Sequence, residues 1–238
     1  MTLTVRRSTL AIGTAPALQL GRNSILADKP VQSVRVEDLQ THAVFDRPKR
    51  SGIRELQRIR RGEKAVEAIR GLTKENELYG FTKGQFSSID LLKACLAHTG
   101  PARLSVSTWT AARNDILQLE RLKAAGQLLS VRFLLDFTFA RRDPEAAHAI
   151  RQTFGIDSIR VALNHSKFAL FENDDWRLVL RTSMNLNTNP RFEDFTLAND
   201  PELADFIGGI LREIWTKQQR SLADAPCSEV RRHFVDEL

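Results

Sequence analysis

The chain has 238 residues, enough for one large domain or for one domain and an arm, and its 42% hydrophobic and 27% charged residues are typical of a globular protein. No apolar run reaches the roughly 18 residues that a membrane-spanning helix needs, so we expect no membrane partner. The two cysteines, Cys95 and Cys227, form neither a metal-ligand spacing nor a disulfide framework, which favours the cytoplasm.

The net charge of +6 comes from the first third of the chain. Residues 1–71 contain 14 Lys and Arg against 7 Asp and Glu, whereas residues 72–238 contain 21 against 22. A basic block of this kind favours a polyanionic partner, nucleic acid before a membrane surface. A solvated arm whose charge only aids solubility is the alternative.

The first 72 residues are predicted to form two segments. Residues 1–50 alternate short apolar runs with Gly, Pro and basic residues, and we expect a basic N-terminal arm. Residues 51–72 are predicted to form a basic amphipathic helix, because apolar residues recur at helical spacing and form one stripe: Ile53, Leu56, Ile59, Val66, Ile69 and Leu72. Basic side chains one turn apart can follow a phosphate backbone, although they can equally be a solvated face. The expected nucleic-acid contacts of this region are Lys49, Arg50, Arg54, Arg58 and Arg61.

Residues 73–238 are predicted to form an α/β domain, because strands and helices alternate from Phe81 onward. Helices are expected at residues 87–98, 111–125, 144–154 and 201–221, and strands at 103–109, 130–137 and 158–163, followed by a β-hairpin within 164–194. Functional groups in such sheets gather where strands end, which is where Trp109, Asp136 and Ser183 fall. Trp109 is therefore a further candidate for nucleic-acid binding.

The hairpin region carries the residues best suited to chemistry. His165 and Lys167 are two positions apart, as are Ser183 and Asn185, and alternate residues of a strand share a face. A nucleophilic imidazole beside a fixed cation, with a hydroxyl and an amide opposite, suits attack on a phosphodiester. There is no HExxH motif and no pair of histidines at metal-binding spacing near an acidic cluster, so neither a metal nor a cofactor is expected.

These residues resemble the HxKxxxxD…GSxN motif of the phospholipase D superfamily, which includes small bacterial endonucleases with one motif per chain. The matching positions are His165, Lys167, Glu172 and the run from Thr182 to Asn185. The stretch from Gly84 also looks like a phage or prophage group of such proteins. The resemblance implies a mixed β-sheet flanked by helices and two motifs that meet in one metal-independent active site.

Carried over by position, the resemblance implies that His165 is the nucleophile, forming a phosphohistidine, or the acid. Lys167 would be the phosphate clamp, and Ser183 and Asn185 the anion-binding pair. Glu193 is the candidate to orient the imidazole. One motif per chain requires a homodimer that brings two histidines together.

Two positions depart from the motif. Glu172 stands where the superfamily has Asp, and Thr182 where it has Gly, so that its side chain is expected to crowd a phosphate. The two-part motif and the basic charge of residues 1–71 favour, as the first hypothesis, a metal-independent nuclease acting on DNA. The second is a DNA-binding protein with the same fold and weak or no catalysis. A lipid-acting phosphodiesterase ranks last, because no amphipathic membrane-facing element stands out.

Overall fold

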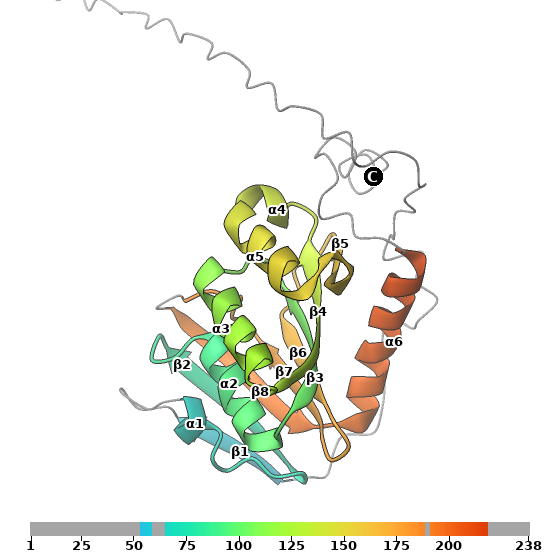
Figure 1. Cartoon of the computed structure of the whole chain (residues 1–238). Helices are drawn as coiled ribbons and strands as arrows, with labels where there is room; N and C mark the ends of the chain where they lie inside the picture. The colour runs from blue at the N-terminus through green and yellow to red at the C-terminus, as the bar shows by residue number, and fades with distance from the viewer. Residues whose placement is uncertain (1–52, 59–64, 189–190, 219–238) are drawn as a thin grey trace, which may run out of the picture. The chain divides into compact units, whose positions relative to one another are not determined.

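The computed structural model describes residues 53–58, 65–188 and 191–218, with only the backbone in the first range, and all of them belong to the second of the chain's two units, Val31–Leu238. They form an eight-stranded mixed sheet with helices on both faces (Figure 1). This arrangement confirms the predicted fold class. The elements in chain order are β1 (Ile53–Arg58), α1 (Ala65–Ala68), β2 (Asn76–Lys83), α2 (Ser88–Thr99), β3 (Ala102–Thr108), α3 (Arg113–Ala124), β4 (Leu128–Asp136), α4 (Phe139–Arg142), α5 (Pro144–Phe154), the 3-10 helix η3 (Ile156–Ser158), β5 (Ile159–Ala162), β6 (Phe168–Glu172), β7 (Arg177–Thr182), β8 (Phe192–Asn199) and α6 (Pro201–Lys217).

The strand order across the sheet is β1-β2-β8-β7-β6-β3-β4-β5. The pairs β1–β2, β3–β4 and β4–β5 are parallel, and all of the pairs from β2 across to β3 are antiparallel. β6 and β7 are the predicted hairpin, closed at its turn by the Asn173 N–H, which donates to the Trp176 carbonyl at 3.1 Å. The hairpin lies at the centre of the sheet, so residues at its open end meet the ends of β3 and β8.

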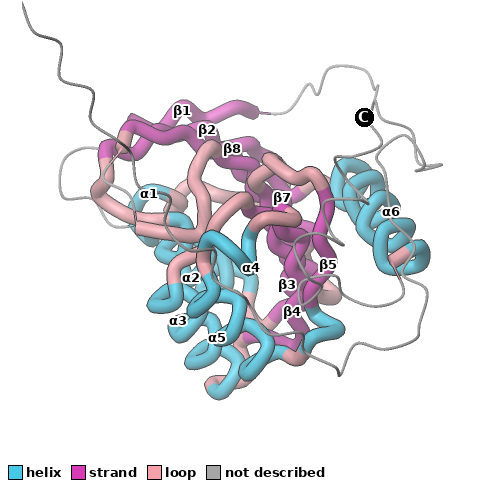
Figure 2. The backbone as a smooth tube through the Cα atoms, turned by 90° about the horizontal axis from the view of Figure 1, so that it is seen from above, coloured by secondary structure: helices cyan, strands magenta, loops and turns pink. Residues whose placement is uncertain are grey.

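The two faces of the sheet are covered differently. The larger core cluster, which includes Phe133 and Phe171, packs beneath α1, α2, α3 and α5 on one face. On the other face α6 packs alone among the described helices, with Leu211 and Ile214 against Val179 and other residues of β4–β7 (Figure 2). The part of this second face formed by β8 and β2 lies beyond the apolar contacts of α6.

Local sequence signals account for several of these elements. α2 begins at Ser87, whose N–H and Oγ both donate to the Asp90 carboxylate, at 2.9 and 2.8 Å. It ends at Gly100, which has a φ of 79° that favours glycine. In the sheet, Gly80 of β2 admits the ring of Phe195, because a Cβ there would lie 2.4 Å from the Phe195 Cζ.

The predicted helix over residues 51–72 is wrong for most of the residues that the structure describes there. Ile53–Arg58 is a strand that pairs in parallel with β2, and the only described helix in the region is α1, Ala65–Ala68. Apolar residues at helical spacing are weak evidence for a helix when a neighbouring strand can satisfy the hydrogen bonds of the backbone. Of the expected apolar stripe, Ile69 and Leu72 are buried, whereas Val66 is 59% exposed. The predicted arm, residues 1–50, lies outside the described residues.

Most of the elements predicted after residue 81 are present, with ends displaced by a few residues. β2, β8 and the short α4 were not predicted. β2 and β8 each have a burial pattern that approaches alternation, but polar residues such as Asn76, Thr82 and Asp194 interrupt the apolar signal. Both strands face the core on one side and lie beyond α6 on the other, which explains their mixed composition.

Candidate active site

His165 lies in the segment that links β5 to β6, just before the strand on which it was expected. The buried Asn164 fixes this segment: its Nδ2 donates to the Ser107 Oγ at 3.0 Å and to the Leu134 carbonyl at 3.2 Å. Its Oδ1 accepts from the Ser166 N–H at 3.1 Å. These bonds reach β3 and β4 near their carboxyl ends, so the imidazole is held at the end of the parallel strands, the usual place for a functional site.

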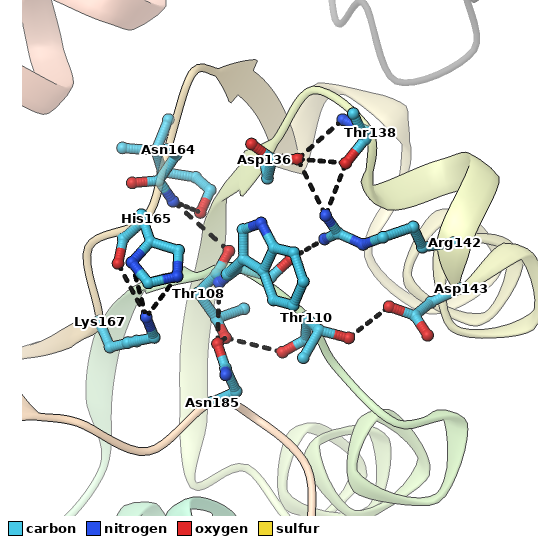
Figure 3. Close-up of polar contacts among 12 residues, drawn as sticks. Thr108, Thr110, Asp136, Thr138, Arg142, Asp143, Asn164, His165, Lys167 and Asn185 are labelled. Atoms are coloured by element: carbon cyan, nitrogen blue, oxygen red, sulfur yellow. Dashed lines mark hydrogen bonds and ion pairs between the residues drawn. The ribbon is translucent and has the colours of Figure 1, made fainter.

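Lys167 lies against His165, as predicted. Its Nζ donates to the His165 carbonyl at 2.9 Å and is 3.2 Å from the imidazole Nδ1 (Figure 3). Partial burial lowers the pKa of Lys167, and the negative charge of Glu193 partly opposes that effect. Because the His165 side chain is exposed, an anion can approach the imidazole and the ammonium together.

Ser183 and Asn185 follow β7 at the same end of the sheet. The Ser183 Oγ donates to a Glu193 carboxylate oxygen and accepts from the Asp194 N–H at 2.9 Å. The Asn185 Oδ1 accepts from the backbone N–H of Trp109 at 3.2 Å. With the amide oxygen fixed on the end of β3, the Nδ2 of Asn185 is the group that can donate to an anion.

Trp109 lies between a cation and the imidazole. The guanidinium carbon of Arg142 is 3.7 Å from the centroid of the indole, and the indole and His165 ring centroids are 5.8 Å apart with an interplanar angle of 61°. Arg142 is itself held by Asp136, at the end of β4, with 3.1 Å between Nη1 and Oδ1. The cation–π contact with Arg142 holds the indole in place, and the indole in turn supports the ring of His165. Trp109 as a nucleic-acid contact stays a prediction.

The two departures from the motif do not touch the imidazole. Glu172 lies at the far end of β6, where it pairs with Arg177 at 3.4 Å. The Thr182 Oγ1 donates to the Asp194 carbonyl at 2.7 Å and accepts from the Met184 N–H at 3.0 Å, so this side chain braces the turn that carries Ser183. Crowding of a phosphate by Thr182 stays a prediction.

Glu193 does not have its expected partner. Among the described residues the imidazole has hydrogen bonds with Lys167, whereas Glu193 accepts from Ser183. The backbone nevertheless joins the two halves of the site, because the Thr182 N–H donates to the Lys167 carbonyl at 3.3 Å. His165, Lys167, Ser183, Asn185 and Glu193 therefore gather at one end of the sheet.

The structure does not describe the side chains of the basic residues that were predicted to contact nucleic acid in the N-terminal region. Lys49, Arg50 and Arg61 lie outside the described residues, and Arg54 and Arg58 lie on β1, of which only the backbone is described. β1 is separated from the hairpin by β2 and β8. Their contact with nucleic acid stays a prediction.

Sequence reasoning did not identify two residues that shape the site. Asn164 had a usable signal, since it is a polar residue at the end of a buried strand and directly precedes the histidine. Arg142 had none, because it is one arginine among many and only the fold brings α4 over Trp109.

No group of three or more metal-ligating side chains occurs within the described ranges. None of the helices formed by residues 65–188 and 191–218 combines the length and hydrophobicity of a bilayer-spanning segment.

The fold and the site define an α/β protein with an exposed imidazole and an ammonium group at the end of a mixed sheet. No protein-family model matches the chain, and no curated protein matches it. The chain is similar to the solved structure of NucT from Helicobacter pylori, with 14% identity and a TM-score of 0.42, over 58% of this chain and 97% of that one. It is similar to polyphosphate kinase from Porphyromonas gingivalis, with 17% identity and a TM-score of 0.42, over 63% of this chain and 27% of the kinase. It is also similar to phosphatidylserine synthase from Haemophilus influenzae, with 14% identity and a TM-score of 0.41, over 66% of this chain and 43% of the synthase. The match spans less than half the length of the kinase and of the synthase.

Proposed function

We propose that the protein is a phospholipase D-like phosphodiesterase that cleaves DNA without a metal ion, at a site shared by two subunits. The observation that carries this proposal is the contact of Lys167 with an exposed His165, 3.2 Å from Nζ to Nδ1, beside Ser183 and Asn185. A phosphodiester has two non-bridging oxygens that carry one negative charge. A lysine, a hydroxyl and an amide are suitable donors for those oxygens, and they stabilise the charge that develops in the transition state.

The imidazole supplies the nucleophile. A neutral His165 nitrogen attacks phosphorus, an N–P bond forms, and the P–O bond to one nucleoside breaks. The departing oxygen takes a proton from a second imidazole, which is now neutral. Water then attacks the phosphohistidine, gives a proton to that second imidazole, and releases the phosphate end as the N–P bond breaks. The cycle restores both rings to their starting states.

The second imidazole must come from outside the described part of the subunit. Of the described histidines, His98 packs on Trp176 at 5.2 Å near the turn of the hairpin, and His148 lies on the exposed side of α5. Neither accompanies His165 at the site. A two-fold axis beside His165 would bring in the His165 of the partner subunit, and an isologous contact of this kind is the commonest route to a dimer.

The test is cleavage of plasmid and single-stranded DNA in EDTA. The wild-type protein is expected to cleave under chelation, and His165→Ala and Lys167→Ala are expected to be inactive. His148→Ala is the matched control, since it removes an exposed imidazole elsewhere, and it is expected to retain full activity. Cleavage that EDTA abolishes, or that survives in His165→Ala, would overturn the proposal.

The shared site has its own test. If each site needs two histidines, randomly mixed dimers made from equal amounts of wild type and His165→Ala retain about one quarter of the activity, against one half for independent sites. A fully active monomer in sedimentation or light scattering would refute the dimeric site.

One observation favours a second function. Glu193 lies against Ser183, so a carboxylate is next to a hydroxyl that the proposal assigns to a phosphate oxygen, and its negative charge opposes anion binding. The alternative is a DNA-binding protein without catalysis. It predicts salt-sensitive binding, no cleavage, and loss of binding when residues 1–50 are removed. The truncation must stop before β1, because that strand belongs to the sheet.

A further inference from the structure

Three aromatic side chains lie together on the sheet where α6 does not cover it. Phe81 and Phe192 are stacked, with ring centroids 5.0 Å apart and an interplanar angle of 19°, and Tyr79 meets Phe81 edge-on at 5.1 Å. Phe192 is 63% exposed and Phe81 38%, so both rings present area to solvent. We call Tyr79, Phe81 and Phe192 the aromatic row.

The register of the strands places the aromatic row on the α6 face. Val179 packs beneath α6, and Arg181, two positions along β7, shares its face. Arg181 pairs with Thr196, and Thr196 pairs with Tyr79. The aromatic row therefore lies on the same face of the sheet as α6. It begins where the apolar contacts of α6 with β4–β7 end.

Exposed rings of this size need an explanation. Burial of one phenylalanine stabilises a protein substantially, and a contiguous exposed aromatic cluster marks a binding surface more often than a lone exposed residue does. Within the described part of the chain, the ring contacts of Phe81 and Phe192 are with each other and with Tyr79, and both phenylalanines remain exposed.

The charges beside the row indicate the kind of ligand. Lys83 is the cross-strand partner of Phe192, and Arg181 lies across β8 from Tyr79; both are exposed. The acidic residues on the same face are Asp194, the partner of Phe81, and Glu77, two positions before Tyr79 on β2. Planar rings beside two cations suit a ligand that combines flat, uncharged groups with phosphates, which describes a nucleic-acid strand with unpaired bases.

The row also lies close to the candidate active site. The Ser183 N–H donates to the Asp194 carbonyl at 3.1 Å, and Asp194 pairs directly with Phe81. Two strand spacings, about 10 Å, therefore separate the backbone of Ser183 from that of Phe81. A strand with one phosphate at His165 can reach the row with bases a few nucleotides away.

We propose that the aromatic row binds unpaired nucleobases by stacking, so that the substrate is single-stranded nucleic acid or a duplex with an unpaired segment. The proposal rests on the proposed function for the identity of the polymer. Duplex DNA keeps its bases stacked inside the helix and cannot use the row. Preference for single strands over duplexes is thus the direct consequence.

The test measures binding separately from cleavage. Fluorescence anisotropy of a labelled oligothymidine, in EDTA and on the full-length His165→Ala protein, gives the affinity for single strands, with a duplex of equal length beside it. In the His165→Ala protein, a further Phe192→Ala substitution is expected to weaken single-strand binding about 5-fold or more and to leave duplex binding unchanged. Phe192→Trp is expected to restore binding, whereas Phe192→Leu, apolar but unable to stack, is not. Leu129→Ala, an equally exposed apolar residue on β4, is the matched control.

A second variant keeps the test independent of folding. Lys83→Gln is expected to lower the slope of log affinity against log salt by about 0.7 for a single strand, the effect of one lost phosphate contact. Circular dichroism confirms that each variant is folded before it is scored.

The outcomes separate this inference from the proposed function. Wild-type cleavage with single-strand affinity unchanged in Phe192→Ala overturns the aromatic row and leaves the phosphodiesterase standing. Single-strand binding lost in Phe192→Ala, without cleavage by the wild type, supports the row and refutes the enzyme. If Phe192→Ala instead dissociates a dimer without changing DNA affinity, the row is a contact between subunits and the proposal is wrong.

Discussion

Asp115, in the first turn of α3, is a buried carboxylate that is expected to destabilise the protein at neutral pH. Its side chain is 2% exposed, and its Oδ2 has no hydrogen-bond partner among the described residues. The Gln118 Nε2 donates to Oδ1 at the long distance of 3.5 Å. Burial, and to a smaller extent the charge of Asp90, raise the pKa of Asp115 to about 6.

The sign of the pH dependence follows from the folded pKa lying above the unfolded one. Below the unfolded value of about 3.9 the group is protonated in both states and costs nothing. As the pH rises toward 6, the unfolded state ionises more readily than the folded one, so the free energy of unfolding falls. Above the pKa of the folded state, the decrease in the free energy of unfolding is complete. A shift of about two units corresponds to at most about 3 kcal/mol.

Asp115→Asn keeps the shape of the side chain and removes the charge. We expect it to stabilise the protein by about 1–3 kcal/mol at pH 8 and to change little at pH 4. Urea denaturation of variant and wild type at both pH values measures the difference, and Asp174→Asn, in the exposed hairpin turn, is the control. An equal effect at the two pH values, or destabilisation at pH 8, would refute the assignment of a strained buried charge.

Three other substitutions test the packing around the site and the sheet. Arg142→Ala removes the cation over Trp109 and leaves a buried carboxylate unpaired, so we expect a loss of about 2–4 kcal/mol in urea denaturation; an unchanged midpoint would contradict it. Asn164→Ala breaks buried hydrogen bonds to two strands and is expected to cost about 2–4 kcal/mol and to speed amide exchange in the segment carrying the histidine; unchanged exchange rates would exclude this role. Gly80→Ala forces a Cβ into the Phe195 ring and is expected to lower stability by about 1–3 kcal/mol in thermal unfolding, and combining it with Phe195→Leu should recover part of the loss if the collision is the cause.

The regular part of the fold was predictable because its signals are local. α2 has a serine at its N-terminus and a glycine at its end, and β4 is a nearly continuous apolar run. The failure at β1 has a physical cause. Ile53 and Leu56 fit a helix as well as a strand, and the deciding factor is the backbone of β2, more than fifteen residues away in sequence. Local patterns contain no information on such a partner.

The residues of the site also divide into those that local sequence could predict and those that it could not. His165 and Lys167 were found because two residues only two positions apart in the sequence make one contact, at 3.2 Å. The role expected for Glu193 depended on the path of β8, a strand that was not predicted, and its carboxylate meets Ser183 instead. The support that Arg142 gives to Trp109 depends on the placement of α4 over β3, which only tertiary structure determines.

The buried amide of Asn164 has a consequence for how the protein unfolds on heating. The segment that holds His165 has the position of a surface loop, yet its anchor donates to two strands in the interior. Local opening of this segment would break hydrogen bonds that water cannot easily replace, at a cost comparable to opening the strands themselves. Fraying of this segment alone is therefore expected to be rare, and heating should open it in the same cooperative transition that unfolds the whole sheet.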